Sequence, residues 1–591
     1  MRAMNMKRAI VKSQILLAAL IAVAMLFTVS AQAAAPGITG TTFNLVATPA
    51  YLNQPDGQAI YSWGYGCVSQ PAASAFVPAM SRAGFCNTMQ VPGPTLVVTE
   101  GQTITVTLTN NLPAAAGNTS ILFPGFNVCA ATLDAGTGAC TGTATGVPGV
   151  LTQEAAPGAS VTYTFVASSP GTRAYYSGTQ SDLQVEMGLY GAIIVLPKTI
   201  PAACTTGVHA DNLAAESNWK ESDYRLKNAS GQTGAAYDHP DSCYDREYLF
   251  QFSEIDPRIH TAAQQQVSAI ASCSTANGNI CPTTLQVPTE PYHPNYFLIN
   301  GRSMPDDMDP NYATEYPHQP YNGDPHMHPG ELSLIRIIGQ GRWQHPFHEH
   351  ANHLRILGRD GNLILSSQNV NYATTGASPI LAPGLAGPLL FTTTTTPGLA
   401  MDAIFYWTGK GLNWDAYGHT PNSNDSLGKL GCYPDANGYN TGYDPVTGAL
   451  THPEVINAVN YYEWCQDHNK PVQAAPFGDV SGGGPVTLPD PNLFTNGPWY
   501  GGSPYLGPDA TMRATGCMSS TAPQTNSPNC GGTGSTPPSG TIANSPSSEA
   551  GFAFMWHSHN EREITTNNIF PGGMLMMMLV DSREYPIDET N

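Results

Sequence analysis

The chain has 591 residues, including 59 Gly and 50 Pro, and only 11% of its residues are Asp, Glu, Lys or Arg. Lys and Arg number 23 against 43 Asp and Glu, and the resulting net charge of −20 excludes nucleic-acid binding through phosphate neutralisation. A hydrophobic content of 41%, with 27 Tyr, 18 Phe and 8 Trp, excludes intrinsic disorder, and the length predicts several domains.

The first 33 residues have the pattern of a secretory signal peptide. A basic segment, Arg2 to Lys12, precedes an apolar run, Ile15 to Val29, and the small-residue motif Ala31-Gln32-Ala33 follows. We therefore predict cleavage near Ala33 and a secreted or periplasmic protein. No later stretch is long and apolar enough to cross a bilayer, so we expect no membrane span.

All twelve cysteines follow this segment, and an even number of cysteines in an exported chain indicates disulfides. A zinc site is the less favoured alternative, because no C-x-x-C pair is present. Sequence does not determine the connectivity, but pairing each cysteine with its neighbour would close six short loops. The pairs would be Cys67–Cys86, Cys129–Cys140, Cys204–Cys243, Cys273–Cys281, Cys432–Cys465 and Cys517–Cys530.

The strand signals predict an all-β protein. Short Thr/Val-rich runs at 96–99 and 103–108, an alternating run at 161–166 and a buried type of run at 191–196 are separated by turn residues. Convincing helical periodicity is scarce. Short strands punctuated by Gly and Pro favour sandwiches of two packed sheets.

A second strand-rich block runs from 247 to about 407, and a final strand is expected at 551–556. The Gly-, Pro-, Asn- and Asp-rich stretch between them is too long for an ordinary loop, so we predict an insertion held by disulfides. The predicted organisation is a signal peptide (1–33), a first domain (34–199), a linker (200–244), a second domain (245–581) with an insertion (409–549), and a tail (582–591).

Two histidine motifs are the strongest candidates for chemistry. In the motif 345–350, His348 and His350 share one face of a strand, while His345 is offset from them. His557 and His559 form a second i, i+2 pair at the end of an aromatic strand. Imidazole suits copper, zinc or iron, and the two pairs together would supply four nitrogens. Structural histidines are the alternative, but two such motifs after β runs favour metal binding.

With these motifs the chain resembles the multicopper oxidases, a family built from cupredoxin β-sandwich domains. The resemblance covers most of 85–200, 290–410 and 550–581. It rests on Val91-Pro-Gly-Pro-Thr95 with Glu100-Gly101, Pro170-Gly-Thr172 with Gly188-Leu-Tyr-Gly191, Ile299-Asn-Gly301 with Arg355-Ile-Leu-Gly-Arg-Asp-Gly361, and Trp556-His-Ser-His559 with Gly573-Met574. It implies two Greek-key cupredoxin-like domains, copper as the cofactor, a small-molecule reductant and, as in two-domain members, a trimeric homo-oligomer.

The chain departs from the family in the residues that hold the trinuclear copper cluster. The family supplies eight histidines from four motifs, and the two first-domain motifs align with residues 122–125 and 176–178, where no histidine remains. The second domain keeps all four of its cluster positions, namely His348, His350, His557 and His559. This one-sided loss favours a repurposed second-domain site with a reduced copper complement.

The electron-entry copper of the family needs a His, a Cys, a second His and usually an axial Met. Here His345 is kept, Ser558 takes the place of the Cys, Glu563 that of the second His, and Met574 follows after a longer spacer. Serine lacks the thiolate on which a blue copper site depends. We therefore expect an altered oxidoreductase activity in place of four-electron reduction of dioxygen, with His345 and Glu563 as two less certain metal ligands.

Two other functions stay open. The same scaffold suits a non-catalytic secreted protein that binds metal or has a structural role. The spacing Gly551-x5-His557-x-His559-x3-Glu563 also matches the first metal motif of the cupins, in which two His and a Glu bind one metal ion. The second cupin motif is not recognisable, so this alternative ranks below the others. The sequence assigns neither a substrate nor a catalytic residue.

Overall fold

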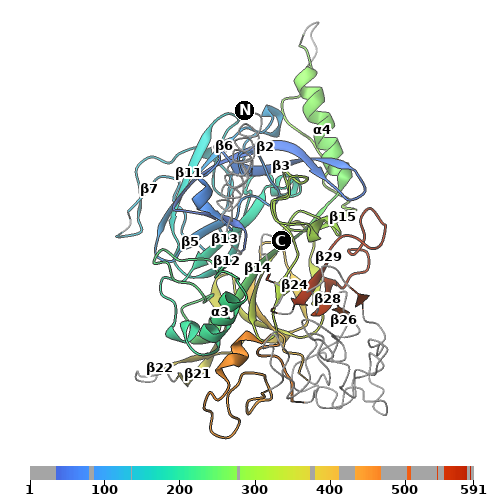
Figure 1. Cartoon of the computed structure of the whole chain (residues 1–591). Helices are drawn as coiled ribbons and strands as arrows, with labels where there is room; N and C mark the ends of the chain where they lie inside the picture. Colours follow the sequence, from blue (N-terminus) through green and yellow to red (C-terminus); the bar gives the residue numbers. More distant parts are fainter. Residues whose placement is uncertain are drawn as a thin grey trace, which may run out of the picture.

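The computed structural model describes residues 35–78, 85–134, 136–275, 280–372, 380–410, 433–458, 460–466, 502–506, 542–543, 551–581, 583 and 586–587. The predicted signal peptide, its cleavage site and much of the predicted insertion lie outside these residues. The described chain is mostly β-strand, and its main strands form two pairs of sheets (Figure 1).

The first pair of sheets encloses a hydrophobic core of its own. One sheet has the order β12 (Gly171–Tyr176), β13 (Tyr190–Leu196), β5 (Leu96–Thr99), β1 (Gly37–Thr39), β4 (Phe76–Val77), and the other the order β11 (Ser160–Val166), β6 (Thr103–Asn110), β2 (Thr42–Asn53), β3 (Ala59–Cys67). The period-two pattern of β6 explains the layering, because Ile104, Val106 and Leu108 are buried while the threonines between them face outward.

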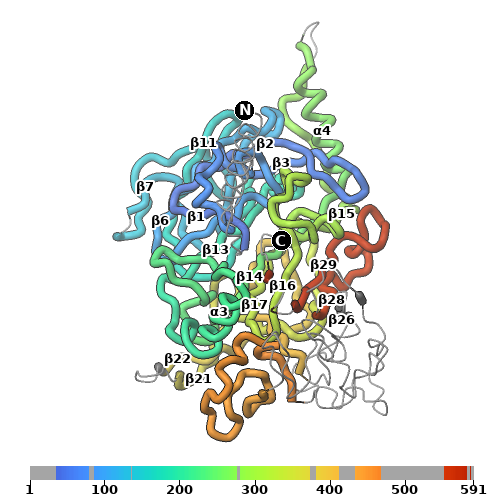
Figure 2. Tube along the Cα trace, in the orientation of Figure 1, coloured from blue at the N-terminus to red at the C-terminus, as the bar shows by residue number. Residues whose placement is uncertain are grey.

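The second pair of sheets encloses a core rich in aromatic residues and methionine. Its first sheet has the order β15 (Tyr296–Ile299), β14 (Arg246–Ile255), β17 (Leu332–Gly339), β25 (Ala400–Tyr406), β19 (Leu354–Arg359), β20 (Asn362–Leu363), with β23 (Leu389–Leu390) beside β19. Its second sheet has the order β16 (His326–Met327), β29 (Leu575–Asp581), β28 (Gly551–Ser558), β18 (His345–Glu349), β24 (Thr392–Thr395), with β26 (Gly502–Leu506) and β27 (Ile542–Ala543) beside β28. In Figure 2 the red C-terminal strands lie beside the chain around β16, as the β16–β29 pairing requires. The predicted fold class, cupredoxin-like β-sandwiches, is confirmed.

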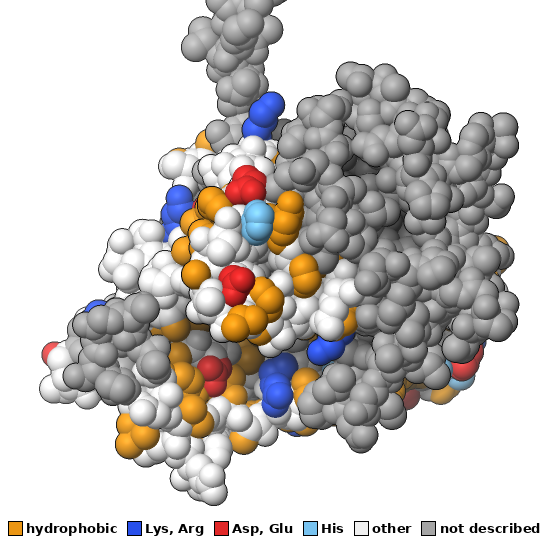
Figure 3. All heavy atoms as spheres, turned by 60° about the horizontal axis from the view of Figure 1, so that its bottom comes forward, with side chains coloured by type: hydrophobic (Ala, Val, Ile, Leu, Met, Phe, Trp, Pro, Cys, Tyr) orange, Lys and Arg blue, Asp and Glu red, His pale blue; other side chains and the backbone are white. Residues whose placement is uncertain are grey.

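Smaller elements complete the described chain. They are β7 (Thr132–Leu133), β8 (Cys140–Thr141), β9 (Val147–Pro148), β10 (Gln153–Glu154), the two-stranded ribbon of β21 (Leu365–Tyr372) and β22 (Ile380–Leu385), the one-turn helix α2 (Ser181–Gln184), and 3-10 turns at Ala73–Ala75, Ala114–Ala116, Ala202–Thr205, Pro240–Ser242, Asp306–Met308 and Pro453–Asn457. Two longer helices, α3 (Val208–Asn218) and α4 (Pro257–Ser272), interrupt the strands. On the face drawn in Figure 3, charged side chains of the described residues are scattered and form no single-sign patch.

A buried polar cluster joins the two pairs of sheets. Asp402 on β25 accepts hydrogen bonds from the Thr172 backbone N (3.0 Å) and hydroxyl (2.5 Å) on β12, and from the Tyr237 hydroxyl (2.7 Å). Arg336 on β17 lies 3.3 Å from Asp402 and 2.8 Å from Glu247. Both carboxylates share the Arg336 guanidinium, so the cluster places paired charges in the contact between the sandwiches.

Four of the predicted disulfides are present, namely Cys67–Cys86, Cys129–Cys140, Cys204–Cys243 and Cys273–Cys281. Cys465 is also disulfide-bonded, while Cys432, Cys517 and Cys530 lie outside the described residues. Disulfides of this number are typical of extracellular or periplasmic proteins. Within the described ranges, no helix combines the length and the apolar character needed to cross a membrane.

Candidate metal centre

Pairing of β18 with β28 brings the two histidine motifs together. The two strands are antiparallel neighbours, and His348 lies directly opposite His557. Since alternate residues of a strand face the same side, His350 and His559 lie on the same face as this pair. Phe347 and Trp556 point the other way, into the core, where their rings are 6.0 Å apart. The sheet therefore separates four imidazoles on one face from an aromatic core on the other.

The four imidazoles, which we call the histidine quartet (His348, His350, His557 and His559), are close enough to share one ion. The ring centres are separated by 4.9 Å (His348–His350), 4.8 Å (His348–His559), 5.6 Å (His348–His557), 5.2 Å (His350–His557) and 5.5 Å (His557–His559). Nitrogen ligands at about 2.0 Å from one tetrahedral ion would place their ring centres roughly 5 Å apart. The observed spacing matches that arrangement.

Hydrogen bonds to Nδ1 orient two rings of the quartet. His557 Nδ1 donates to the Ser558 carbonyl oxygen at 2.7 Å, and His348 Nδ1 hydrogen-bonds with the Thr392 hydroxyl at 2.7 Å. Burial, followed by the neighbouring imidazoles, lowers the pKa of His348 to about 4, and burial also lowers the pKa of His557. Both rings are therefore neutral near pH 7, and the neutral imidazole is the form that binds a metal cation.

The chemistry of the quartet fits a copper or zinc ion, since neutral imidazole is a preferred ligand of both. The rings are not yet in final ligand geometry: among the described residues, no three His, Cys, Asp or Glu side chains form a ready-made metal site. Most pairs of rings meet edge to face, at angles of 68° to 81°.

His345 lies on the core-facing side of β18 and is part of a different cluster. Its Nδ1 donates to Glu563 at 2.9 Å and its Nε2 donates to Glu254 at 3.0 Å. Burial opposes the charged ring, yet the hydrogen bonds with these two carboxylates raise the pKa of His345 to about 9. The Ser558 hydroxyl donates to the same Glu563 oxygen at 2.5 Å, and Asn560 donates to the other at 2.9 Å. A metal ion bound by His345 or Glu563 would have to displace this network, so their role as ligands stays a prediction.

The two first-domain motifs that lack histidine also come together. Leu122 and Tyr176 pair through backbone hydrogen bonds of 2.7 and 3.3 Å. A Cβ atom on Gly178 would lie 2.8 Å from Cγ of Leu122, so leucine packs directly against this glycine. These two segments therefore pair through their backbones, and a leucine packs against the glycine at this contact.

Two residues that touch the histidines were not predicted. Thr392 lies in the threonine run 392–396, which carries no motif, and becomes a partner of His348 because β24 pairs with β18. Glu254 ends the apolar strand β14 and meets His345 only through the packing of the two sheets. Sequence holds no local signal for either contact, since both depend on which strands become neighbours.

One family of known proteins matches part of the first sandwich in sequence. Residues 78–200 match the sequence model of the family described as multicopper oxidase. This segment is therefore similar in sequence to the multicopper oxidases. The match begins just after β4 and ends after β13, so the multicopper oxidase segment comprises most of the first sandwich and includes both motifs that lack histidine.

Solved multicopper oxidases and a copper nitrite reductase resemble the chain at low similarity. The blue copper oxidase from Nitrosomonas europaea has 18% identity and a TM-score of 0.33, over 61% of this chain and 74% of that one. The copper nitrite reductase from Nitrosomonas europaea has 18% identity and a TM-score of 0.32, over 63% and 86%. The multicopper oxidase Fet3p has 17% identity and a TM-score of 0.35, over 63% and 46%. A search of curated proteins gives no match.

Proposed function

We propose that the histidine quartet binds copper and that the protein is a secreted, copper-dependent oxidoreductase of altered type. The convergence of four imidazoles from β18 and β28, with ring centres 4.8 to 5.6 Å apart, carries the proposal. A copper ion held there would supply one-electron redox chemistry toward a small-molecule reductant. Secretion through the predicted signal peptide, the predicted domain limits and a trimeric assembly belong to the same proposal.

The protein's own residues would hold and orient the ion. His348, His350, His557 and His559 would bind it through Nε2, while Thr392 and the Ser558 carbonyl fix the rings that they contact. Trp556 anchors the strand from the core side, because its Nε1 donates to the His350 carbonyl oxygen at 3.2 Å.

The cluster around His345 supports an activity with fewer copper ions than in the multicopper oxidases. Ser558 lies between two quartet histidines, and its hydroxyl is bound to Glu563. No thiolate is present at this position to bind a second copper and pass electrons to the quartet. The proposal therefore contains one copper site and no four-electron reduction of dioxygen.

A non-catalytic metal-binding protein is the second candidate. It is favoured by the cluster around His345, because both ring nitrogens are already hydrogen-bonded to carboxylates. A cupin-like site is less well supported, because Glu563 already hydrogen-bonds with His345, Ser558 and Asn560. Turnover distinguishes the first two candidates, and metal stoichiometry distinguishes both from a protein with no metal.

The test is to load the purified protein with copper, dialyse it, measure bound copper, and then follow oxygen consumption with a phenol and with Fe²⁺. Copper-dependent turnover is expected for the oxidoreductase, and bound copper without turnover would establish the second candidate. The control is the double variant His348→Ala, His557→Ala, which should bind no copper. Wild-type protein that retains no metal, or a double variant that retains it, would refute the quartet as the site.

A further inference from the structure

A second candidate site lies beside α3, apart from the strands β18 and β28 that carry the quartet (Figure 1). A cavity of about 500 Å³ is formed there by α3, the turn after it and the segment 231–233. This volume is in the range of pockets that hold small organic molecules. The cavity is open to solvent along α3, where Ala210, Ala214 and Ser217 are exposed.

His209 presents one ring nitrogen to this cavity. Its Nδ1 donates to Asp245 at 2.8 Å, and both side chains are buried. Asp245 also accepts hydrogen bonds from Asn212 (3.1 Å) and from the Leu332 backbone N (2.9 Å), which hold the carboxylate behind the ring. His209 lines the cavity and Asp245 does not, so the opposite edge of the ring, with Nε2, faces it. In the tautomer whose Nδ1 donates, Nε2 can accept a hydrogen bond.

The remaining wall combines aliphatic side chains with polar ones, among them Thr205, Ser217 and Gln232, and its charges are paired. Leu213 and the neighbouring alanines of α3 supply apolar surface. The charge of Arg225 is compensated by Asp223, through bonds of 2.8 Å from Nε and 3.2 Å from the terminal nitrogen, and Arg225 also donates to the Tyr244 carbonyl oxygen. The hydroxyl of Thr233 has no hydrogen-bond partner among the described residues. Such a wall attracts neither anions nor cations strongly.

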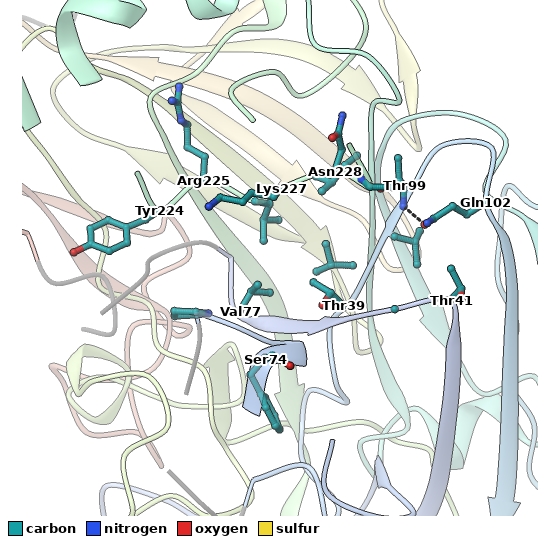
Figure 4. Close-up of a pocket in the computed structure, with 18 of the residues that line it drawn as sticks. Thr39, Thr41, Ser74, Val77, Thr99, Gln102, Tyr224, Arg225, Lys227 and Asn228 are labelled. Atoms are coloured by element: carbon teal, nitrogen blue, oxygen red, sulfur yellow. Dashed lines mark hydrogen bonds between the residues drawn. The ribbon is translucent and has the colours of Figure 1, made fainter. Parts of the chain in front are cut away.

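Arg225 also separates this cavity from a neighbouring hollow. That hollow, of about 450 Å³, lies between strands β1, β4 and β5 and the segment 223–229, and it shares only Asp223 and Arg225 with the cavity beside α3. In Figure 4 the Arg225 side chain turns away from Ser74 and Val77. The neighbouring hollow has no imidazole in its wall, so the acceptor of His209 is specific to the cavity beside α3.

We propose that the cavity beside α3 binds a small neutral alcohol. Its hydroxyl would donate to His209 Nε2, and its aliphatic body would pack against Leu213 and the alanines of α3. A hydroxyl donor satisfies the imidazole acceptor without bringing a charge into a wall whose own charges are paired. The site is independent of copper, and its failure would leave the proposed function of the quartet untouched.

The test uses 4-tert-butylcyclohexanol and, as a matched probe, its methyl ether, which keeps the aliphatic body and lacks the donor. Calorimetry and saturation-transfer NMR on the full-length protein should show binding of the alcohol that is about 10-fold tighter than binding of the ether, as one lost hydrogen bond implies. His209→Phe should weaken binding of the alcohol by a similar factor and leave binding of the ether unchanged. His452→Phe, at a histidine elsewhere in the chain, should change neither.

Leu213→Trp provides a second variant that leaves the His209–Asp245 pair intact. It should fill the cavity and abolish binding of both probes, with the circular dichroism spectrum of the wild type. The proposal is overturned when neither probe binds wild-type protein, when both bind equally well, or when Leu213→Trp does not affect binding.

Discussion

The Nε2 atoms of His350 and His557 lie 3.3 Å apart. His557 donates through Nδ1 to a carbonyl oxygen, which can only accept, so Nε2 of the neutral ring carries a lone pair. A second nitrogen at this distance must therefore share a proton or a cation with it. Two ligands about 2.0 Å from one tetrahedral ion are separated by about 3.3 Å. The contact between these two residues is therefore one that either a shared proton or a shared cation can bridge.

Thr392 should tune metal affinity through His348. Replacing it by Val keeps the shape of the side chain and removes the hydroxyl that bonds to Nδ1 at 2.7 Å. Loss of such an outer-shell partner costs about 10- to 100-fold in metal affinity. We expect that loss for Thr392→Val in a competition titration with a copper chelator.

Two variants of the same strand control this prediction. Thr392→Ser restores a hydroxyl and should recover most of the affinity. Thr394→Val makes the same change at an exposed position of β24 and should have no effect. Equal affinities for wild type and Thr392→Val would show that the hydroxyl does not orient the ring.

Copper-loaded protein should lack an intense blue absorption. Ser558 holds the position at which the family has a thiolate, and its hydroxyl is bound to Glu563 at 2.5 Å. Four imidazoles give only the weak ligand-field bands of an ordinary copper(II) site. Visible spectra recorded during copper titration check this, and a strong blue band would contradict the assignment of the site.

Asp402 should be important for stability. It bonds with Thr172, Tyr237 and Arg336, all of which are buried. Arg336 keeps Glu247 as its partner when Asp402 is removed, but the buried hydroxyls of Thr172 and Tyr237 lose their acceptor, which costs about 1–3 kcal/mol for each unsatisfied group. Asp402→Ala should lower the free energy of unfolding by about this amount in urea titrations.

An exposed aspartate serves as the control for Asp402. Asp238→Ala, in the linker, should change the free energy of unfolding by less than about 0.5 kcal/mol. A similarly small effect for Asp402→Ala would mean that the polar cluster contributes little to the contact between the sandwiches.

His326 should make stability depend on pH. Burial disfavours its charge, but the carboxylates of Asp324 (3.1 Å) and Asp581 (2.7 Å) raise the pKa of His326 well above its ordinary value. A raised folded pKa adds stability that is complete below the unfolded pKa of about 6.5 and is lost as the pH rises through the folded pKa. The free energy of unfolding should therefore fall above neutral pH.

His326→Gln isolates this contribution. The variant should lose the part of the slope that arises from His326, as measured by urea titrations between about pH 6 and pH 10. A wild-type slope that the variant retains in full would assign the pH dependence to other groups.

The strands and short-range disulfides are accessible from sequence, and the two longer helices, α3 and α4, are not. β6 follows a strict alternation of apolar residues and threonine, which predicts a half-buried strand. Helix α4 was missed inside the second strand-rich block. The sequence nevertheless carries signals for this helix. Asp256 caps it by accepting a hydrogen bond from the Arg258 backbone N at 3.1 Å, and Pro257 is its first residue. Ile259 and Ala263 share its buried face.

The histidine quartet was predictable in part. The i, i+2 spacing places each histidine pair on one strand face, which depends only on local geometry. The pairing of β18 with β28 joins residues more than 200 positions apart, and only the resemblance to the multicopper oxidases indicated it. The hydrogen bond between His345 and Glu254 was not predictable, because it arises from packing between two sheets.

X-ray absorption spectroscopy at the copper edge tests the central claim most directly. Copper-loaded wild-type protein should show nitrogen ligands at about 2.0 Å together with the outer scattering of imidazole rings. The double variant His350→Ala, His559→Ala should lose both the imidazole signal and most of the copper. Copper bound mainly through oxygen or sulfur, or an imidazole signal that survives in the double variant, would contradict the histidine quartet as the metal site.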